Sequence, residues 1–294
     1  KEPRHLLLAA FIWGAVPVGI LSIIGEETLG QPLTALDEAS AQLLSSTLLA
    51  PVVEESAKGF AVFLLLLFFW REFDDVLDGI IYGATVGFGF AMSENVFYFA
   101  ASLQQAGLEG LVTSAFFRAI VFGMNHALFT SIFGASLGYA RMGARGCLRW
   151  AMPPLGLLGA MFVHGMHNLL VSLSSAVCLL MSVMNNWGGM LVILAVILLA
   201  AQQEKRWIAV HLKAEVESGL LTAEEYDMIG SYRKRLGAIW RARSRYGPGE
   251  ARRLSKLAQL ATELAFKMEQ GDERKAQKLR GEIAALRGTQ AIAK

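Results

Sequence analysis

The stretch Pro51-Val52-Val53-Glu54-Glu55-Ser56-Ala57-Lys58 decides the fold, because it places three charged side chains inside a long apolar run. Residues 41–70 are rich in Leu, Ala, Phe and Val, as in a membrane-spanning helix. Each ionised group at the centre of a bilayer costs about 2.5 to 3.5 kcal/mol, so such groups are usually functional or paired. In a helix, Lys58 lies within reach of both Glu54 (i,i+4) and Glu55 (i,i+3). We therefore expect the lysine to neutralise one carboxylate partly, and the two glutamates, which point about 100° apart, to have different roles.

The composition indicates a polytopic membrane protein. The 294 residues are 54% hydrophobic and 18% charged. Residues 1–202 contain 8 Lys and Arg against 13 Asp and Glu, whereas residues 203–294 contain 19 against 12. This shift predicts a transmembrane domain over residues 1–202 and a basic, helical, cytoplasmic domain over residues 203–294. The two cysteines, Cys147 and Cys178, form no CxxC pair and predict no disulfide framework.

Apolar segments predict an all-α polytopic membrane protein with about six transmembrane helices and a C-terminal soluble helical extension. The segments cover about 5–24, 41–70, 79–103, 112–140, 150–181 and 187–201. In the second span, Pro51 is expected to kink the helix just before the glutamates. In the third, Gly83, Gly87 and Gly89 would let helices approach closely. The sequence Asn-Asn-Trp-Gly-Gly at 185–189 predicts a turn between the fifth and sixth spans.

The basic residues outside the spans predict the orientation of the chain. With six spans, one side of the membrane receives Lys1, Arg4, Arg71, Arg141, Arg145, Arg149, Lys205 and Arg206. Because Lys and Arg accumulate in cytoplasmic loops, we expect both termini to be cytoplasmic.

The segment 203–294 is charged and helix-prone, and we expect two to four soluble helices in it. Thr222 to Glu225 reads as a capping box at a helix start, and residues 246–249, Tyr-Gly-Pro-Gly, predict a break. Its net charge of +7 favours anionic lipid headgroups, while a solvated helical appendage or an oligomerisation element explains it equally well. No nucleic-acid-binding motif is present, so we expect no nucleic-acid partner.

Further polar side chains lie within the apolar spans, namely Glu94, Arg118, His126, His164 and His167. Taken singly, Glu94 can be a structural hydrogen-bond anchor and His126 a packed core histidine. Counted at 1.5 Å per residue from the span ends, however, Glu54, Glu94, His126 and His164 lie at similar depth on four helices. Two carboxylates and two imidazoles suit a catalytic zinc site with three protein ligands and an open water position. A carboxylate beside that water can act as the general base.

The same residues resemble a known family, the PrsW intramembrane proteases, which are related to the CAAX-prenyl protease and bacteriocin-immunity superfamily. The similar motifs cover about residues 40–175 and comprise Glu54-Glu55-x-x-Lys58, Asp78-Gly79-Ile80-Ile81-Tyr82-Gly83, Phe90-x-x-x-Glu94 followed by Asn95 and Tyr98, His126, and His164-x-x-x-Asn168. The resemblance implies a helical protease of the bacterial cytoplasmic membrane that cuts membrane-anchored proteins near or within the bilayer. Typical members are linked to the cleavage of membrane-anchored anti-sigma factors.

Carried onto this chain, the resemblance gives each motif residue an expected role. Glu94, His126 and His164 would hold a zinc ion and its water. Glu54 or Glu55 would take the proton of the water as it attacks the scissile carbonyl, with Glu54 the favourite.

Two more motif residues would assist this centre. Asn168 would donate to the developing oxyanion, an interaction typically worth about 3 to 4 kcal/mol. Lys58 would orient or neutralise the second glutamate. The related prenyl proteases have a histidine at the position of Glu94, so a metal-free protease with a glutamate-activated water is an alternative.

Two other classes of protein also place charged groups inside the membrane. Buried Glu, His and Lys form proton relays in ion- or proton-coupled transporters, although this sequence shows no convincing internal repeat. A non-catalytic binding or immunity protein could keep the same fold. Metal content and cleavage of membrane-anchored substrates would separate these hypotheses.

Overall fold

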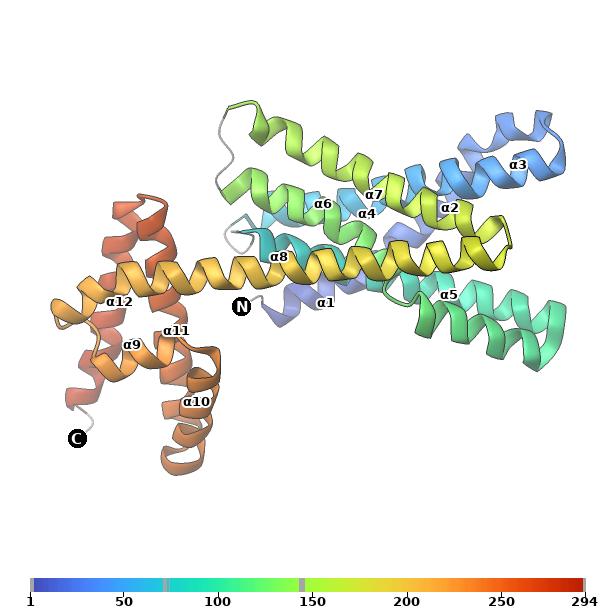
Figure 1. Cartoon of the computed structure of the whole chain (residues 1–294). Coiled ribbons are helices and arrows are strands. Elements are labelled where there is room, and N and C mark those ends of the chain that lie inside the picture. Colours follow the sequence, from blue (N-terminus) through green and yellow to red (C-terminus); the bar gives the residue numbers. More distant parts are fainter. Residues whose placement is uncertain (1–2, 71–72, 74, 143–145, 293–294) are drawn as a thin grey trace. The chain divides into compact units, whose positions relative to one another are not determined.

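The computed structural model describes residues 3–70, 73, 75–142 and 146–292, and these are all helical or in short connections, without a strand (Figure 1). Lys1, Arg71 and Arg145, which contribute to the predicted charge asymmetry, lie outside the described residues. The chain forms two compact units that divide between Ile197 and Leu198. The predicted domain boundary at residue 202 lies close to this division.

The first unit contains the predicted spans. Its elements are α1 (Arg4–Trp13), η1 (Gly14–Val18), α2 (Gly19–Leu29), η2 (Gln31–Ala35), α3 (Glu38–Leu44), η3 (Ser45–Leu49), α4 (Ala50–Phe68), α5 (Val76–Ala115), η4 (Phe116–Val121), α6 (Asn125–Met142), α7 (Leu148–Ser172) and the first part of α8 (Ala176–Glu217). Among the described residues, four helical stretches are long and apolar enough to cross a membrane: Arg4–Ala35, Val76–Arg141, Leu148–Ser172 and Ala176–Glu217. The protein is therefore a multi-pass, all-helical membrane protein.

The four stretches correspond to the predicted spans in different ways. Val76–Arg141 contains both the third and the fourth predicted spans. These two are separated at Ala106 and Gly107, which leave the helical conformation within α5, and Gly107 has a φ of +62° that glycine adopts without strain. The stretch from α3 to α4 is not among the four, because Glu54, Glu55 and Lys58 place three charges within five residues.

The predicted turn at residues 185–189 is wrong, and with it the expected ends of the fifth and sixth spans. Helix α8 is continuous through these residues, and the break lies at residues 173–175, between α7 and α8. Ser174 adopts a positive φ of 51° there, and the Ser175 hydroxyl caps the backbone N–H of Cys178 at 3.1 Å. Asn186 stays helical because its side chain donates to the carbonyl of Ser182 at 2.9 Å.

The predicted irregularity at Pro51 is confirmed. The five residues of η3 are π-helical, and Pro51 occupies the first turn of α4, directly before the glutamates. The predicted fourth span is also irregular, because residues 122–124 interrupt the helix between η4 and α6. Non-helical backbone at membrane depth is tolerated where protein buries it or where it lines a cavity. Helix α6 therefore begins inside the apolar region, whereas α3, η3 and α4 follow one another without a break.

A row of glycines holds α5 against α6, as the sequence predicts. Gly79, Gly83 and Gly87 follow one another at four-residue spacing, and a Cβ on any of them would overlap the backbone of α6. A Cβ on Gly83, for example, would lie 2.6 Å from the carbonyl oxygen of Thr130. Gly89 instead faces the carbonyl of Phe11 in α1. This close approach brings the following turns of α5 next to the start of α6.

The second unit comprises the remainder of α8 with α9 (Ala223–Ile229), α10 (Tyr232–Tyr246), α11 (Pro248–Glu269) and α12 (Glu273–Ile292). It has an apolar core whose fully buried members include Leu212, Ile229, Leu257, Leu264 and Ile283. The capping box at Thr222 is confirmed, with both of its hydrogen bonds to Glu225 present at 2.8 and 3.1 Å. The predicted break is confirmed by Gly247, which separates α10 from α11 with a φ of +88°.

Candidate active site

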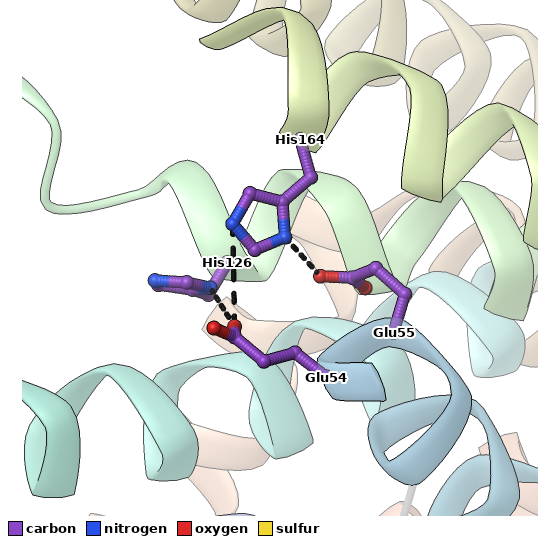
Figure 2. A group of neighbouring side chains, drawn as sticks. All are labelled: Glu54, Glu55, His126 and His164. Carbon is purple, nitrogen blue, oxygen red and sulfur yellow. Dashed lines mark hydrogen bonds and ion pairs between the residues drawn. The ribbon is translucent and has the colours of Figure 1, made fainter. Parts of the chain in front are cut away.

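Three helices bring two carboxylates and two imidazoles together in the first unit (Figure 2). Glu54 and Glu55 come from α4, His126 from the first turn of α6 and His164 from α7. Each of the four residues is buried, and each contributes a donor atom to a group whose members all lie within 4.8 Å of one another. Glu94 from α5 contacts this group through His126. The structure thus brings together the carboxylates and imidazoles that were predicted to lie at one depth.

Lys58 is the cation at the centre of the group. Its ammonium nitrogen lies 2.7 Å from Glu55 Oε1, 3.1 Å from Glu54 Oε2 and 3.0 Å from His126 Nδ1. It also lies 4.1 Å from the ring centroid of Phe90, and the side chain is completely buried. The predicted contacts of Lys58 with both glutamates are therefore present. A buried ammonium group needs such partners, since burial of an unpaired charge is very costly.

The hydrogen bonds of His126 define its tautomer. Its Nε2 lies 2.9 Å from Glu94 Oε2, and an ionised carboxylate only accepts hydrogen bonds. A neutral imidazole therefore carries its hydrogen on Nε2 and keeps the lone pair on Nδ1. That lone pair accepts from Lys58 and lies 3.8 Å from Glu54 Oε2. Glu94 thus orients the histidine rather than joining the group of four.

His164 is oriented in the same way by a different carboxylate. Its Nδ1 lies 2.9 Å from Glu55 Oε1, so the hydrogen belongs on Nδ1 and the lone pair on Nε2. The Nε2 atom lies 4.0 Å from Glu54 Oε2, and the ring is stacked on Phe129 with a centroid distance of 4.7 Å. The ring nitrogens that carry the lone pairs of both imidazoles therefore lie within 4.0 Å of the same oxygen of Glu54, and that of His126 also accepts from Lys58.

The two glutamates of α4 differ in their surroundings, as their spacing predicts. Glu55 is held by His164 and Lys58, and its second oxygen accepts from the Thr130 hydroxyl at 3.4 Å. All the contacts recorded for Glu54 involve Oε2. Glu55 is therefore saturated with hydrogen-bond donors, while Glu54 retains an oxygen for chemistry.

Arg118 holds the carboxylate behind His126. Its guanidinium group forms an ion pair with Glu94, donates to Asn95 Oδ1 at 2.8 Å and lies 3.6 Å from the ring centroid of Tyr98. These partners lie on one face of α5, within five residues of each other. The sequence identified Arg118 as unusual but did not assign it a partner, because Asn95 and Glu94 lie 23 and 24 residues before it in the chain. Thr130, the partner of Glu55, was not identified from the sequence.

Asn168 has a structural partner. Its amide donates to the carbonyl of Ser46 at 2.8 Å. In η3 the N–H of Ala50 donates to the carbonyl of Ser45, five residues earlier. The same spacing would pair the carbonyl of Ser46 with residue 51, but this residue is proline and has no N–H. Asn168 supplies the missing hydrogen bond just before the glutamates. Its predicted role as an oxyanion donor stays a prediction.

His167 lies outside the group of four, in agreement with its ordinary structural interpretation. It contacts a separate set of polar side chains formed by Asn125, Ser182 and Asn186.

The donor types and spacing of the central group fit a zinc ion, which would take the place of Lys58 as the partner of Glu54 Oε2 and His126 Nδ1. Zinc binds imidazole nitrogen and carboxylate oxygen at about 2.0 to 2.2 Å, so neighbouring tetrahedral ligand atoms lie roughly 3.3 to 3.5 Å apart. The two separations from Glu54 Oε2, 3.8 Å to His126 Nδ1 and 4.0 Å to His164 Nε2, are close to this spacing. Histidine ligands of metals usually donate their other N–H to a carboxylate, as both imidazoles do here.

Comparison with known proteins gives a consistent result. Residues 2–202 match the PrsW family of intramembrane metalloproteases. The chain is 33% identical to protease PrsW of Geobacillus kaustophilus over 172 residues, which are 58% of this chain and 68% of that protein. It is 30% identical to protease PrsW of Bacillus subtilis over 177 residues, which are 58% and 72% of the two chains. No solved structure matches the chain. The family match covers well over half of the sequence, including every residue of the central group, and the chain therefore belongs to the PrsW family of intramembrane proteases.

Proposed function

We propose that this protein hydrolyses peptide bonds of membrane-anchored protein substrates within or near the bilayer. The observation that carries the proposal is the buried group formed by α4, α6 and α7, in which a ring nitrogen of His126 and one of His164 both lie within 4.0 Å of Glu54 Oε2. Membership of the PrsW family supports a peptidase. Regulated cleavage of an anti-sigma factor-like protein is the proposed physiological reaction, by analogy with the family.

Zinc is the proposed cofactor, held by His126 Nδ1, His164 Nε2 and Glu54 Oε2. This set differs from the predicted one in that Glu54 replaces Glu94, whose carboxylate is engaged by His126 and Arg118. When bound, zinc would supply Lewis-acid polarisation and lower the pKa of a water molecule.

The side chains of this centre have distinct proposed roles. Glu54 accepts the proton of the attacking water through the oxygen that its other contacts leave available. Glu55 and Glu94 hold the two imidazoles in the required tautomer. Lys58 balances the charge of Glu55, with which it makes its shortest contact, 2.7 Å. Without metal the same arrangement would support a water activated by Glu54 alone, which is the alternative mechanism.

The proposed topology has six membrane passages with both termini in the cytoplasm of a bacterium. Two further passages would be added to the four apolar stretches. The α3–α4 segment would be one, and the other would result if Val76–Arg141 crosses the membrane twice, with Gly107 between the two passages. Residues 203–294 would then form a cytoplasmic helical unit.

A library of single-pass membrane peptides tests the function. Wild-type protein, Glu54→Gln and the lipid-side control Leu67→Met, whose side chain is 56% exposed, would be purified in detergent and incubated with the library. We expect the wild type and Leu67→Met to cleave the same peptides and Glu54→Gln to be inactive. Equal cleavage by Glu54→Gln would contradict the proposal, and proton flux in liposomes without cleavage would support the transporter hypothesis instead.

Metal analysis of the same preparations tests the cofactor. We expect about one zinc per chain in the wild type, and its loss in His126→Ala and His164→Ala. Glu94→Gln should retain zinc but lose about 10- to 100-fold in activity, as is typical when a residue that orients a ligand is changed. An active wild type without metal would favour the metal-free mechanism.

A further inference from the structure

A small hollow lies beside the catalytic centre, between α8 and the interruption in the fourth span. It is partly open and has room for little more than one water-sized group, far less than a pocket for a drug-sized ligand. Its wall is mostly apolar and includes Met124, Trp187 and Met190. The polar exceptions are the amides of Asn125 and Asn186. Because Asn125 directly precedes His126, the hollow adjoins the centre at which the substrate would be cut.

Asn186, which lines this hollow, carries an unpaired side-chain oxygen. The side chain is only 3% exposed, and its amide nitrogen lies 2.9 Å from both the Ser182 carbonyl and His167 Nδ1. A carbonyl oxygen only accepts, so the nitrogen must face Ser182 and the orientation of the amide is fixed. The buried Oδ1 atom then has no partner among the described residues. An unpaired buried acceptor is expensive, which indicates that a donor from another molecule completes it.

The same hydrogen bonds determine the orientation of Asn125. His167 Nδ1 accepts from Asn186, and the Ser182 hydroxyl at 2.7 Å donates to the same atom. The imidazole hydrogen therefore belongs on Nε2, which lies 3.0 Å from the amide of Asn125. The atom of Asn125 that faces Nε2 must then be the oxygen, and the NH2 group is turned away from the histidine. The hollow thus offers an acceptor on Asn186 and a donor on Asn125.

We infer that this hollow binds one residue of the substrate main chain, with Asn186 accepting its N–H and Asn125 donating to its C=O. The inference rests on the proposed protease function. A substrate helix must unwind before a peptide bond can be attacked, and inside the membrane no water replaces the lost backbone hydrogen bonds. In an extended strand the N–H and C=O of one residue point to the same side, as in antiparallel pairing.

Ester-containing substrates test this inference. A peptide that the wild type cleaves would be prepared with each backbone N–H near the cut replaced in turn by an ester oxygen. We expect one ester position to lower kcat/KM about tenfold in the wild type, the usual effect of one lost hydrogen bond to a buried group. For Asn186→Leu, kcat/KM with the ordinary amide substrate should already be about tenfold lower than for the wild type. Replacement of the same N–H by an ester oxygen should then cause no further decrease in kcat/KM.

The neighbouring Asn185→Leu provides the matched control, because Asn185 is not part of the wall of the hollow. It should keep the ester sensitivity of the wild type. This non-additivity separates a direct contact from a folding defect, since a variant that is merely destabilised would remain sensitive to the ester.

The outcomes separate the inference from the proposed function. If the wild type cleaves and Asn186→Leu keeps full ester sensitivity, or if no ester position matters, the subsite is refuted and the protease function stands. If cleavage depends on an Asn or Gln side chain at one substrate position and not on esters, the hollow binds a side-chain amide and the main-chain assignment is wrong. If the wild type and Glu54→Gln are equally inactive, both proposals fail.

Discussion

Replacement of Lys58 by methionine should destabilise the first unit by about 3 to 5 kcal/mol. The ammonium group is fully buried and has three polar partners, Glu55 at 2.7 Å, His126 at 3.0 Å and Glu54 at 3.1 Å. Methionine fills a similar volume but removes the charge that the two carboxylates require. Removal of one partner of a buried ion pair typically costs this amount, because the remaining charge is left uncompensated.

A double-variant cycle isolates the electrostatic part of this effect. In Glu55→Gln combined with Lys58→Met, one negative and one positive charge disappear together. We expect the double variant to lose about 2 kcal/mol less than the sum of the single losses, within the range measured for directly contacting residues. Reversible unfolding in mixed micelles, followed by circular dichroism, measures each free energy.

The lipid-side variant Leu67→Met serves as the control and should leave the unfolding free energy within about 0.5 kcal/mol of the wild type. Strictly additive losses for Glu55→Gln and Lys58→Met would show that the two side chains do not interact, and would refute the description of the centre given above.

Three further changes test other parts of the structure. Gly87→Ala should cost about 1 to 3 kcal/mol and reduce cleavage, since its Cβ would overlap the backbone of α6, whereas Gly188→Ala, with open space around it, should be neutral in unfolding and cleavage assays. Arg118→Gln should lower kcat about 10- to 100-fold while zinc content is retained, because Glu94 loses the cation that holds it; an unchanged kcat would show that Arg118 only packs. Leu264→Ala should destabilise the second unit by about 2 to 5 kcal/mol in chemical denaturation, and a loss below 1 kcal/mol would contradict its buried position.

Local patterns in the sequence predicted much of the fold. The charges of residues 51–58 indicated a buried polar centre, and a simple count along each span placed Glu54, His126 and His164 at one depth. The glycines of the third predicted span indicated a close approach of helices, and the structure places α6 against Gly83 and Gly87. These predictions succeed because helical geometry alone converts a residue number into a height and a face.

The features that the sequence did not reveal depend on contacts between distant segments. Residues 185–189 have the composition of a turn, but Asn186 is held in the helix by its bonds to Ser182 and His167. Likewise, Glu94 has the charge of a metal ligand, and only the position of Arg118 shows that its carboxylate is already engaged. Composition indicates what a side chain can bind, whereas its neighbours in the fold decide what it does bind.

The interruption at residues 122–124 also affects the electrostatics of the candidate active site. Without metal, the carboxylates of Glu54, Glu55 and Glu94 outnumber the cations Lys58 and Arg118, so the formal charge of these five side chains is −1. Because α6 begins at Asn125, the N–H groups of its first turn lie beside His126 rather than at the membrane surface, and those of Asn125 and Leu128 are bonded to Phe122 and Met124. The start of a helix carries about half of a positive elementary charge. A discontinuous span thus provides a partial positive charge at a depth where a lysine would have to be buried, and an unbroken helix would leave the excess negative charge without this compensation.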